Sequence, residues 1–310
     1  MAYTGILLTF CDSSTIIAIL NLIAERMVIM GGSLMHDNIE AIPYDLKANG
    51  VKDLVWILWY LGLHGATPEK YFGSNLAGSS RLAVSCFDIL VGLDYKLGDI
   101  DVFVDKTVYD KVCQNLSNAQ KDTVLYFRKG KLRSTGLFKI NETSHPTQVD
   151  LIPCEFEDGA PKKYFVFSHF SSMVDIQNGV KGFAHKLLCR AYTAGTDWHF
   201  SVDYGCRKDS SNEYISDFDF VCREVLGIVP GQAWSFDSLL RALKDKPESN
   251  QARILEKFGR LVFGEHRQKS SRFPEKDLAN MAAIYKQLDK YQLLTSEIKT
   301  MFEERKRDAW

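Results

Sequence analysis

The spacing of apolar residues predicts helices in the first part of the chain. Apolar side chains run through Ile16–Met30, and the two glycines that follow are typical of a helix end. The Trp-rich stretch Asp53–Leu63 predicts a second apolar helix that packs on the first. Glycine, serine and asparagine then gather between Gly73 and Ser80, which indicates a loop or turn. We therefore expect the chain to be helical up to about Leu63.

The middle of the chain shows the short apolar and alternating runs that are typical of strands. The expected strands are Asp99–Val104, two strands within Thr123–Ile140 joined at Lys129–Gly130, and Thr147–Pro153, which Pro153 ends. An amphipathic pattern over Val108–Gln120 predicts a short helix after the first of these strands. Residues 73–153 are thus predicted to form a small mixed sheet with one or two helices.

Helical spacing returns from about Phe165 to the C-terminus. The expected helices lie in Gln177–Tyr192, in Asp217–Gly227 and in the last stretch of the chain from Phe273 onward. No internal repeat or transmembrane span stands out. The pattern predicts an α+β fold in three parts: an N-terminal helical segment (1–66), a core with a small mixed β-sheet (67–160) and a mainly helical C-terminal domain (161–310).

Composition narrows the class of protein. The 310 residues are 45% hydrophobic and 25% charged, which fits one to three folded domains. The formal net charge of -1 argues against a protein that coats nucleic acid through bulk positive charge. The seven cysteines contain no CxxC pair, which is typical of reduced, buried thiols and excludes a zinc site of the usual spacing. The N-terminal apolar stretch is too short to span a bilayer and shows no cleavage site, so we expect a cytoplasmic protein without membrane contact.

Asp99 and Asp101 stand one residue apart at the start of a predicted strand. Because side chains alternate along a strand, both carboxylates point to one face, and Ile100 and Val102 point to the other. Two carboxylates this close repel each other, and a divalent cation such as Mg²⁺ removes that cost. The alternative is a solvated strand end, which is also our interpretation of Asp105.

Other known uses of an acidic pair fit these flanking residues poorly. Aspartate-nucleophile phosphatases and many nucleotide-sugar glycosyltransferases carry such a pair after an apolar strand, whereas here the strand follows the pair. A calcium-binding EF-hand loop would require an oxygen ligand at Phe103 and a glycine after it. Neither condition is met.

Two further features indicate phosphate and carboxylate chemistry nearby. Gly78, Ser79 and Ser80 open an apolar, helical stretch, where backbone N–H groups and hydroxyls form a natural phosphate cradle. Asp150 lies in a predicted strand between apolar neighbours, where a lone acid is costly without a partner. A third metal-binding carboxylate would resolve that cost, and a capping or salt-bridged acid is the alternative.

In this order, the glycine turn, the acidic pair and the third acid resemble the polymerase-beta-like nucleotidyltransferase superfamily. The resemblance covers residues 73–153, about a quarter of the chain. It implies that Asp99, Asp101 and Asp150 are the catalytic, metal-binding acids. It also implies that the turn at Gly78, Ser79 and Ser80 binds the phosphates of the nucleotide.

The chain also departs from the family pattern. The gap between the glycine turn and the acidic pair is several residues longer than the family's, which implies a longer helix or an extra turn. Phe72–Ser74 and Met30–Ser33 are alternative turns, and the GGxVRD signature of CCA-adding enzymes is absent. These departures suggest a divergent member, such as a phage or viral protein.

The resemblance implies a chemistry and its partners. Two magnesium ions would lie between the acids and a nucleoside triphosphate, for which ATP is the expected substrate. A nucleoside monophosphate would move to a hydroxyl group on RNA (a tRNA end included), a protein or a small molecule, with release of pyrophosphate. Members of the superfamily often take a phosphate-binding lysine from the next helical domain, which implies Lys181 or Lys186 here.

Two alternatives stay open at this point. One is a nucleotide-binding regulatory or interaction protein on the same fold without catalysis, and the other is an unrelated interaction protein. The basic residues that could contact a nucleic-acid backbone, or be ordinary surface charge, are Arg207, Lys208, Arg267, Lys269 and Arg272. The sequence assigns no role to His145, His169 or His185, and it predicts no oligomeric state.

Overall fold

The computed structural model describes residues 35–36, 39–63, 75–119, 122–130, 132–139, 145–264 and 274–308. The helix predicted at Ile16–Met30, both alternative glycine turns and the basic residues Arg267, Lys269 and Arg272 lie outside these ranges.

A four-stranded mixed sheet holds the two acidic segments. Its strands are β5 (Asp99–Asp105), β6 (Val124–Arg128), β7 (Ser134–Phe138) and β8 (Thr147–Cys154). The spatial order is β5-β8-β7-β6, with β5 parallel to β8 and the other pairs antiparallel. The strand that begins at the acidic pair and the hairpin around Lys129–Gly130 are therefore present as predicted, and the architecture is α+β.

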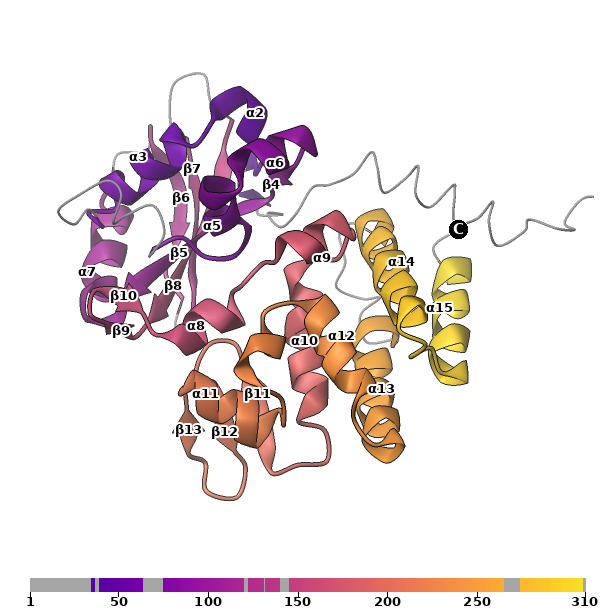
Figure 1. The fold of residues 1–310 in the computed structure, drawn as a ribbon. Helices are drawn as coiled ribbons and strands as arrows, with labels where there is room; N and C mark the ends of the chain where they lie inside the picture. Colours follow the sequence, from indigo (N-terminus) through magenta and orange to yellow (C-terminus); the bar gives the residue numbers. More distant parts are fainter. Residues whose placement is uncertain are drawn as a thin grey trace, which may run out of the picture.

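One face of this sheet packs against helices from the N-terminal half of the chain, as Figure 1 shows. These helices are α2 (Leu46–Asn49), α3 (Lys52–Tyr60), α5 (Gly78–Ser85), α6 (Phe87–Gly92) and α7 (Lys106–Ser117). Ile100 and Val102 of β5 and Leu151 of β8 are fully buried in this core. Helix α3, predicted as part of a separate helical segment, thus shares its core with the sheet.

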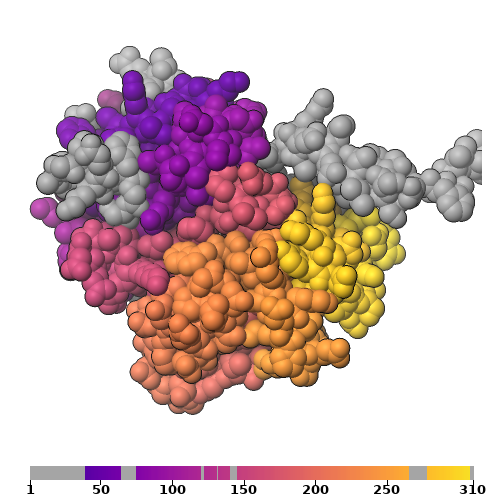
Figure 2. Space-filling view, viewed as in Figure 1, coloured from indigo at the N-terminus to yellow at the C-terminus, as the bar shows by residue number. Residues whose placement is uncertain are grey.

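The opposite face of the sheet meets the C-terminal part of the chain. Phe103 and Ile152 share a second hydrophobic core with helices of that part. Its helices are α8 (Lys163–Ser168), α9 (Met173–Gln177), α10 (Gly182–Tyr192), α11 (Phe218–Phe220), the π-helical turn η1 (Val221–Val225), the 3₁₀ turn η2 (Pro230–Ala233), α12 (Phe236–Lys244), α13 (Glu248–Phe263), α14 (Pro274–Lys290) and α15 (Ser296–Asp308). In the space-filling view, the rose-coloured segment that includes α8 and α9 lies between the purple and orange parts of the surface (Figure 2).

The structure contains further short strands that the sequence did not predict. The additional strands are β1 (Met35–His36), β2 (Ile39–Glu40), β3 (Tyr44–Asp45), β4 (Lys96–Leu97), β9 (Phe156–Glu157), β10 (Ala160–Pro161), β11 (Trp198–Ser201), β12 (Gly205–Lys208) and β13 (Tyr214–Ile215). Strand β3 pairs with β4 across a long sequence separation, and β11–β13 form a three-stranded antiparallel sheet inside the C-terminal part. Runs of two to four residues carry too little periodicity to be recognised locally.

Three predicted boundaries are wrong for identifiable reasons. The helix expected at 177–192 begins only at Gly182, because Gly179 adopts a left-handed backbone with φ of +73° after α9. The last helical stretch is two helices rather than one, with a break between Lys290 and Ser296. Strand β8 continues through Pro153, which is possible because β7 ends opposite Leu151 and leaves that side of the strand without a partner strand.

The expectations about membrane spans and cysteines can also be compared with the structure. No helix within the described ranges is long and apolar enough to cross a membrane. Six of the seven cysteines lie in those ranges; all six are free thiols, and five of them are buried.

Candidate metal and nucleotide site

The carboxylates of Asp99, Asp101 and Asp150 meet at one edge of the two parallel strands. Asp101 of β5 lies directly opposite Asp150 of β8 in the strand register. One oxygen from each of the three carboxylates lies within 4.8 Å of the others. The convergence expected from strand alternation is therefore present, and it follows from the parallel pairing that aligns the two acidic segments.

Asp150 is fully buried and has two polar partners. The side-chain amide of Gln148, two residues earlier on the same strand face, donates to both carboxylate oxygens at 3.2 Å. Arg133, just before β7, forms an ion pair between Nη1 and Asp150 Oδ2 at 3.2 Å. The cost of burying this acid is thus offset by an amide and a guanidinium group.

The glycine turn lies directly beside the acids. Gly78 adopts a φ of +55°, and a Cβ atom added to it would lie 2.9 Å from Asp101 Oδ2. The preceding residues run along the free edge of β5, where the Ala77 N–H donates to the Asp101 carbonyl at 3.0 Å. Glycine is required here because any side chain would combine an unfavourable backbone with a clash against the acid.

Several groups of the glycine turn form structural contacts that the sequence did not predict. The Gly78 N–H donates to the His169 carbonyl at 2.7 Å, so it is engaged by the protein itself. The Ser80 hydroxyl accepts from the Asp101 N–H at 3.1 Å and is buried. Ser79 is buried beside Tyr95. The N–H groups of Ser79 and Ser80, at the first turn of α5, are the donors best placed for an anion.

The long gap between the turn and the acids is filled by regular structure. Helix α5 ends at Ser85, helix α6 follows from Phe87, and β4 pairs with β3 before the chain enters β5. The extra turn expected from the spacing is therefore a second short helix.

Of the two predicted lysines, Lys186 on α10 interacts electrostatically with the acids. It attracts both Asp99 and Asp101, and burial lowers the pKa of its ammonium group while these acids act in the opposite direction. Lys181 precedes the helix, where its backbone N–H donates to Asn280 Oδ1 at 2.8 Å. The electrostatic geometry thus favours Lys186, and a nucleotide contact for Lys181 stays a prediction.

The electrostatics of the site are set by the buried acids. Burial raises the pKa of Asp101 to about 6, with a further contribution from the Asp150 carboxylate, while Lys186 and Arg133 oppose the rise. Burial also raises the pKa of Asp203, in the turn between β11 and β12, where Lys186 again opposes the rise. Negative charge at this site is therefore only partly compensated by the protein's own cations.

A hard divalent cation fits this donor set. Three carboxylates lie close together, and burial disfavours the charged form of Asp101. A bound cation would stabilise that charged form and so remove the cost of burying it. Carboxylate oxygens are the ligands that Mg²⁺ prefers in proteins.

Two residues considered in the sequence have other roles here. Asp105 ends β5, as expected, and its carboxylate also caps α7 by accepting from the Thr107 N–H at 2.8 Å. Arg207 pairs with Asp209 at 2.7 Å, and Lys208 lies over the Trp198 ring.

Sequence reasoning missed four residues of the site: Arg133 and Gln148, which contact Asp150, and His169 and Asp203, which interact electrostatically with Lys186 and Arg133. Gln148 had a readable signal, since it lies two residues before Asp150 and so shares its strand face. Arg133, His169 and Asp203 reach the site through loops and turns, for which the local sequence contains no comparable pattern.

No protein-family model matches this chain, and comparison with curated proteins found no match either. The resemblance to polymerase-beta-like nucleotidyltransferases thus depends on the glycine turn and the three acids alone.

Proposed function

We propose that this protein is a metal-dependent nucleotidyltransferase that moves a nucleoside monophosphate from a triphosphate, with ATP expected, to a hydroxyl acceptor. The observation that carries the proposal is the convergence of three carboxylates from parallel strands beside a glycine turn that opens a helix. RNA is the acceptor we favour testing first, with protein and small-molecule hydroxyls as further candidates.

In this proposal Asp99, Asp101 and Asp150 would hold two magnesium ions. The ions would supply charge neutralisation for the triphosphate and an acidified acceptor hydroxyl. The N–H groups at the start of α5 and the Lys186 ammonium would hold the phosphates from opposite sides. Asp150, the most deeply buried acid, would stand on the acceptor side and take its proton.

The direct test compares wild type with Asp101→Asn in reactions that contain Mg²⁺, each labelled nucleoside triphosphate in turn, and RNA, protein or small-molecule acceptors. We expect label in the acceptor with wild type and a loss of at least about a hundredfold in the variant, as for removal of a catalytic metal ligand. Asp110→Asn on α7 is the matched control, because that carboxylate is exposed and pairs with Lys129 on the surface. Equal incorporation by wild type and Asp101→Asn would remove the catalytic assignment.

One observation favours the alternative of a non-catalytic nucleotide-binding module. Arg133 already neutralises Asp150, so the buried acid has a partner without any metal. A regulatory module would bind labelled ATP without transferring any part of it. Equilibrium binding measured alongside incorporation separates the two functions.

A further inference from the structure

A cavity lies beside the glycine turn. Its volume is about 200 Å³, and it separates the start of α5 from the end of α8. Neither the three acids nor Lys186 is among the residues that line it. Gly78 forms part of its wall, and the same residue lies next to the Asp101 carboxylate.

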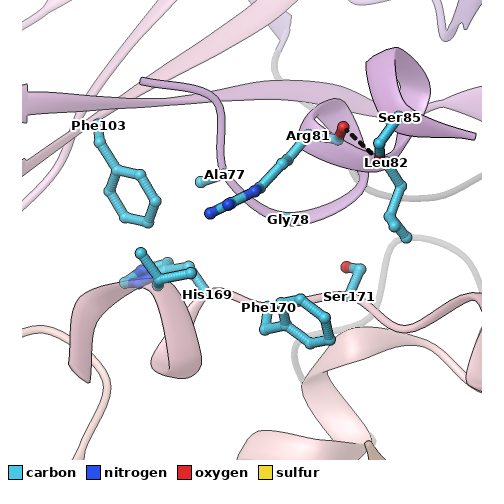
Figure 3. A pocket seen from close by; sticks show the side chains of 10 residues that line it. Ala77, Gly78, Arg81, Leu82, Ser85, Phe103, His169, Phe170 and Ser171 are labelled. Carbon is cyan, nitrogen blue, oxygen red and sulfur yellow. Dashed lines mark hydrogen bonds between the residues drawn. The ribbon is translucent and has the colours of Figure 1, made fainter. Parts of the chain in front are cut away.

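Arg81 supplies the positive charge of this cavity. Its side chain extends from α5 toward the space between Phe103 and His169, as Figure 3 shows. Within the described part of the chain, no acid or carbonyl pairs with its guanidinium group. Burial lowers the pKa of Arg81, and no acid of the described residues acts in the opposite direction. A half-buried arginine without a counter-charge is costly, and a bound anion would remove that cost.

The other walls are aromatic or neutral. Phe103 and Phe170 are apolar, and the edge of the Phe103 ring meets the His169 imidazole at a centroid distance of 5.6 Å. Burial lowers the pKa of His169 well below its usual value, and Lys186 adds to this, so the ring is neutral near pH 7. Ser171 contributes a hydroxyl at the mouth.

The hydrogen bonds of Ser168 define the tautomer of His169. The Ser168 hydroxyl has one hydrogen, which a carbonyl of Phe165 or Val202 accepts, at 3.0 and 2.9 Å. It therefore accepts from His169 Nδ1, 3.0 Å away, which leaves Nε2 as a hydrogen-bond acceptor. The cavity thus combines a neutral ring with a guanidinium group that pairs with none of the described residues.

We propose that this cavity binds a phosphate group through Arg81, separately from the metal-bound triphosphate. The inference deepens the proposed function and rests on it for its biological meaning: a phosphate held beside the Gly78 turn belongs either to a phosphorylated acceptor or to a second nucleotide. The binding step itself needs no metal and no intact acid triad.

The test is calorimetric titration of the full chain in EDTA with inorganic phosphate, AMP and a 5′-phosphorylated RNA trinucleotide. We expect Arg81→Gln to weaken phosphate binding about tenfold or more, the usual effect of losing a charge-assisted partner, and Arg81→Lys to retain part of it. Arg128→Gln, which removes an exposed arginine at the end of β6, is the matched control. Circular dichroism checks that each variant is folded.

Asp101→Asn separates this proposal from the proposed function. It should abolish nucleotide transfer but leave phosphate binding in EDTA unchanged. Competition of the trinucleotide with phosphate identifies an acceptor as the source of the phosphate, and competition by AMP alone identifies a nucleotide. The proposal is overturned if wild type binds no phosphate at millimolar concentration, if Arg81→Gln binds it as wild type does, or if Asp101→Asn abolishes the binding.

Discussion

The three clustered acids should destabilise the metal-free protein, so Asp101→Asn should be more stable than wild type when no metal is bound. Burial and the neighbouring Asp150 raise the pKa of Asp101 from 3.8 to about 6. Below pH 3.8 the carboxyl group is protonated in both folded and unfolded chains, so it costs nothing. As the pH rises from 3.8 to about 6, the unfolded chain releases the proton more readily, and folding loses stability.

The size of this cost follows from the same values. The step from 3.8 to about 6 corresponds to about 3 kcal/mol, at about 1.4 kcal/mol for each tenfold change. Asp101 is partly exposed, so solvent screening reduces the expected gain of Asp101→Asn to about 1–2 kcal/mol in the free energy of unfolding above pH 6. The gain should shrink steadily as the pH falls below 6.

Urea unfolding in EDTA measures this difference for wild type, Asp101→Asn and the exposed control Asp110→Asn, at about pH 8 and about pH 4.5. Saturating Mg²⁺ should reverse the order, since a ligand at about a hundred times its Kd stabilises wild type by about 2.7 kcal/mol and gives the variant less. An Asp101→Asn protein that is no more stable than wild type at pH 8 would refute the reasoning. So would a gain that does not depend on pH.

Three further outcomes are expected. Arg133→Gln should lower the Kd for Mn²⁺ by about three- to tenfold, because the guanidinium group neutralises a carboxylate that the ion needs. Electron paramagnetic resonance measures this Kd, and Lys129→Gln on the same hairpin should leave it unchanged. Weaker Mn²⁺ binding by Arg133→Gln would show that Arg133 positions the acid instead. Gly78→Ala should lower the free energy of unfolding, measured in urea, by about 1–2 kcal/mol and remove most of the transfer activity. The reason is that the backbone has a φ of +55° and the added Cβ would lie 2.9 Å from Asp101 Oδ2. A fully active variant would contradict the assignment of this turn. Asp105→Ala should lower the free energy of unfolding by about 1 kcal/mol through loss of the α7 cap, and it should leave transfer activity unchanged. A variant that is stable but inactive would instead place this acid in the site.

The elements that could be predicted are those whose signal is local. Alternation identified β5 and the face of Asp99 and Asp101, and turn residues identified the β6–β7 hairpin. The meeting of Asp101 with Asp150 had no local signal: it was expected only from the resemblance, and in the structure it depends on the parallel pairing of β5 with β8.

The remaining features depend on contacts between distant segments. Strands β3 and β4 are two residues long and exist because they pair with each other. Arg133 reaches Asp150 from a loop, and the His169 carbonyl accepts from Gly78 across some ninety residues of sequence. No periodicity within either segment contains that information.

The bond between the Gly78 N–H and the His169 carbonyl has a consequence for how the protein can be divided. It makes the glycine turn a connection between the sheet and the C-terminal helices, reinforced by the bridge from Gly78 to Phe170. A chain truncated after residue 160 would keep every candidate metal ligand and still lose the acceptor that orients this turn, together with Lys186. We expect such a fragment to bind neither nucleotide nor phosphate, and an assembly from two separately expressed halves to regain both.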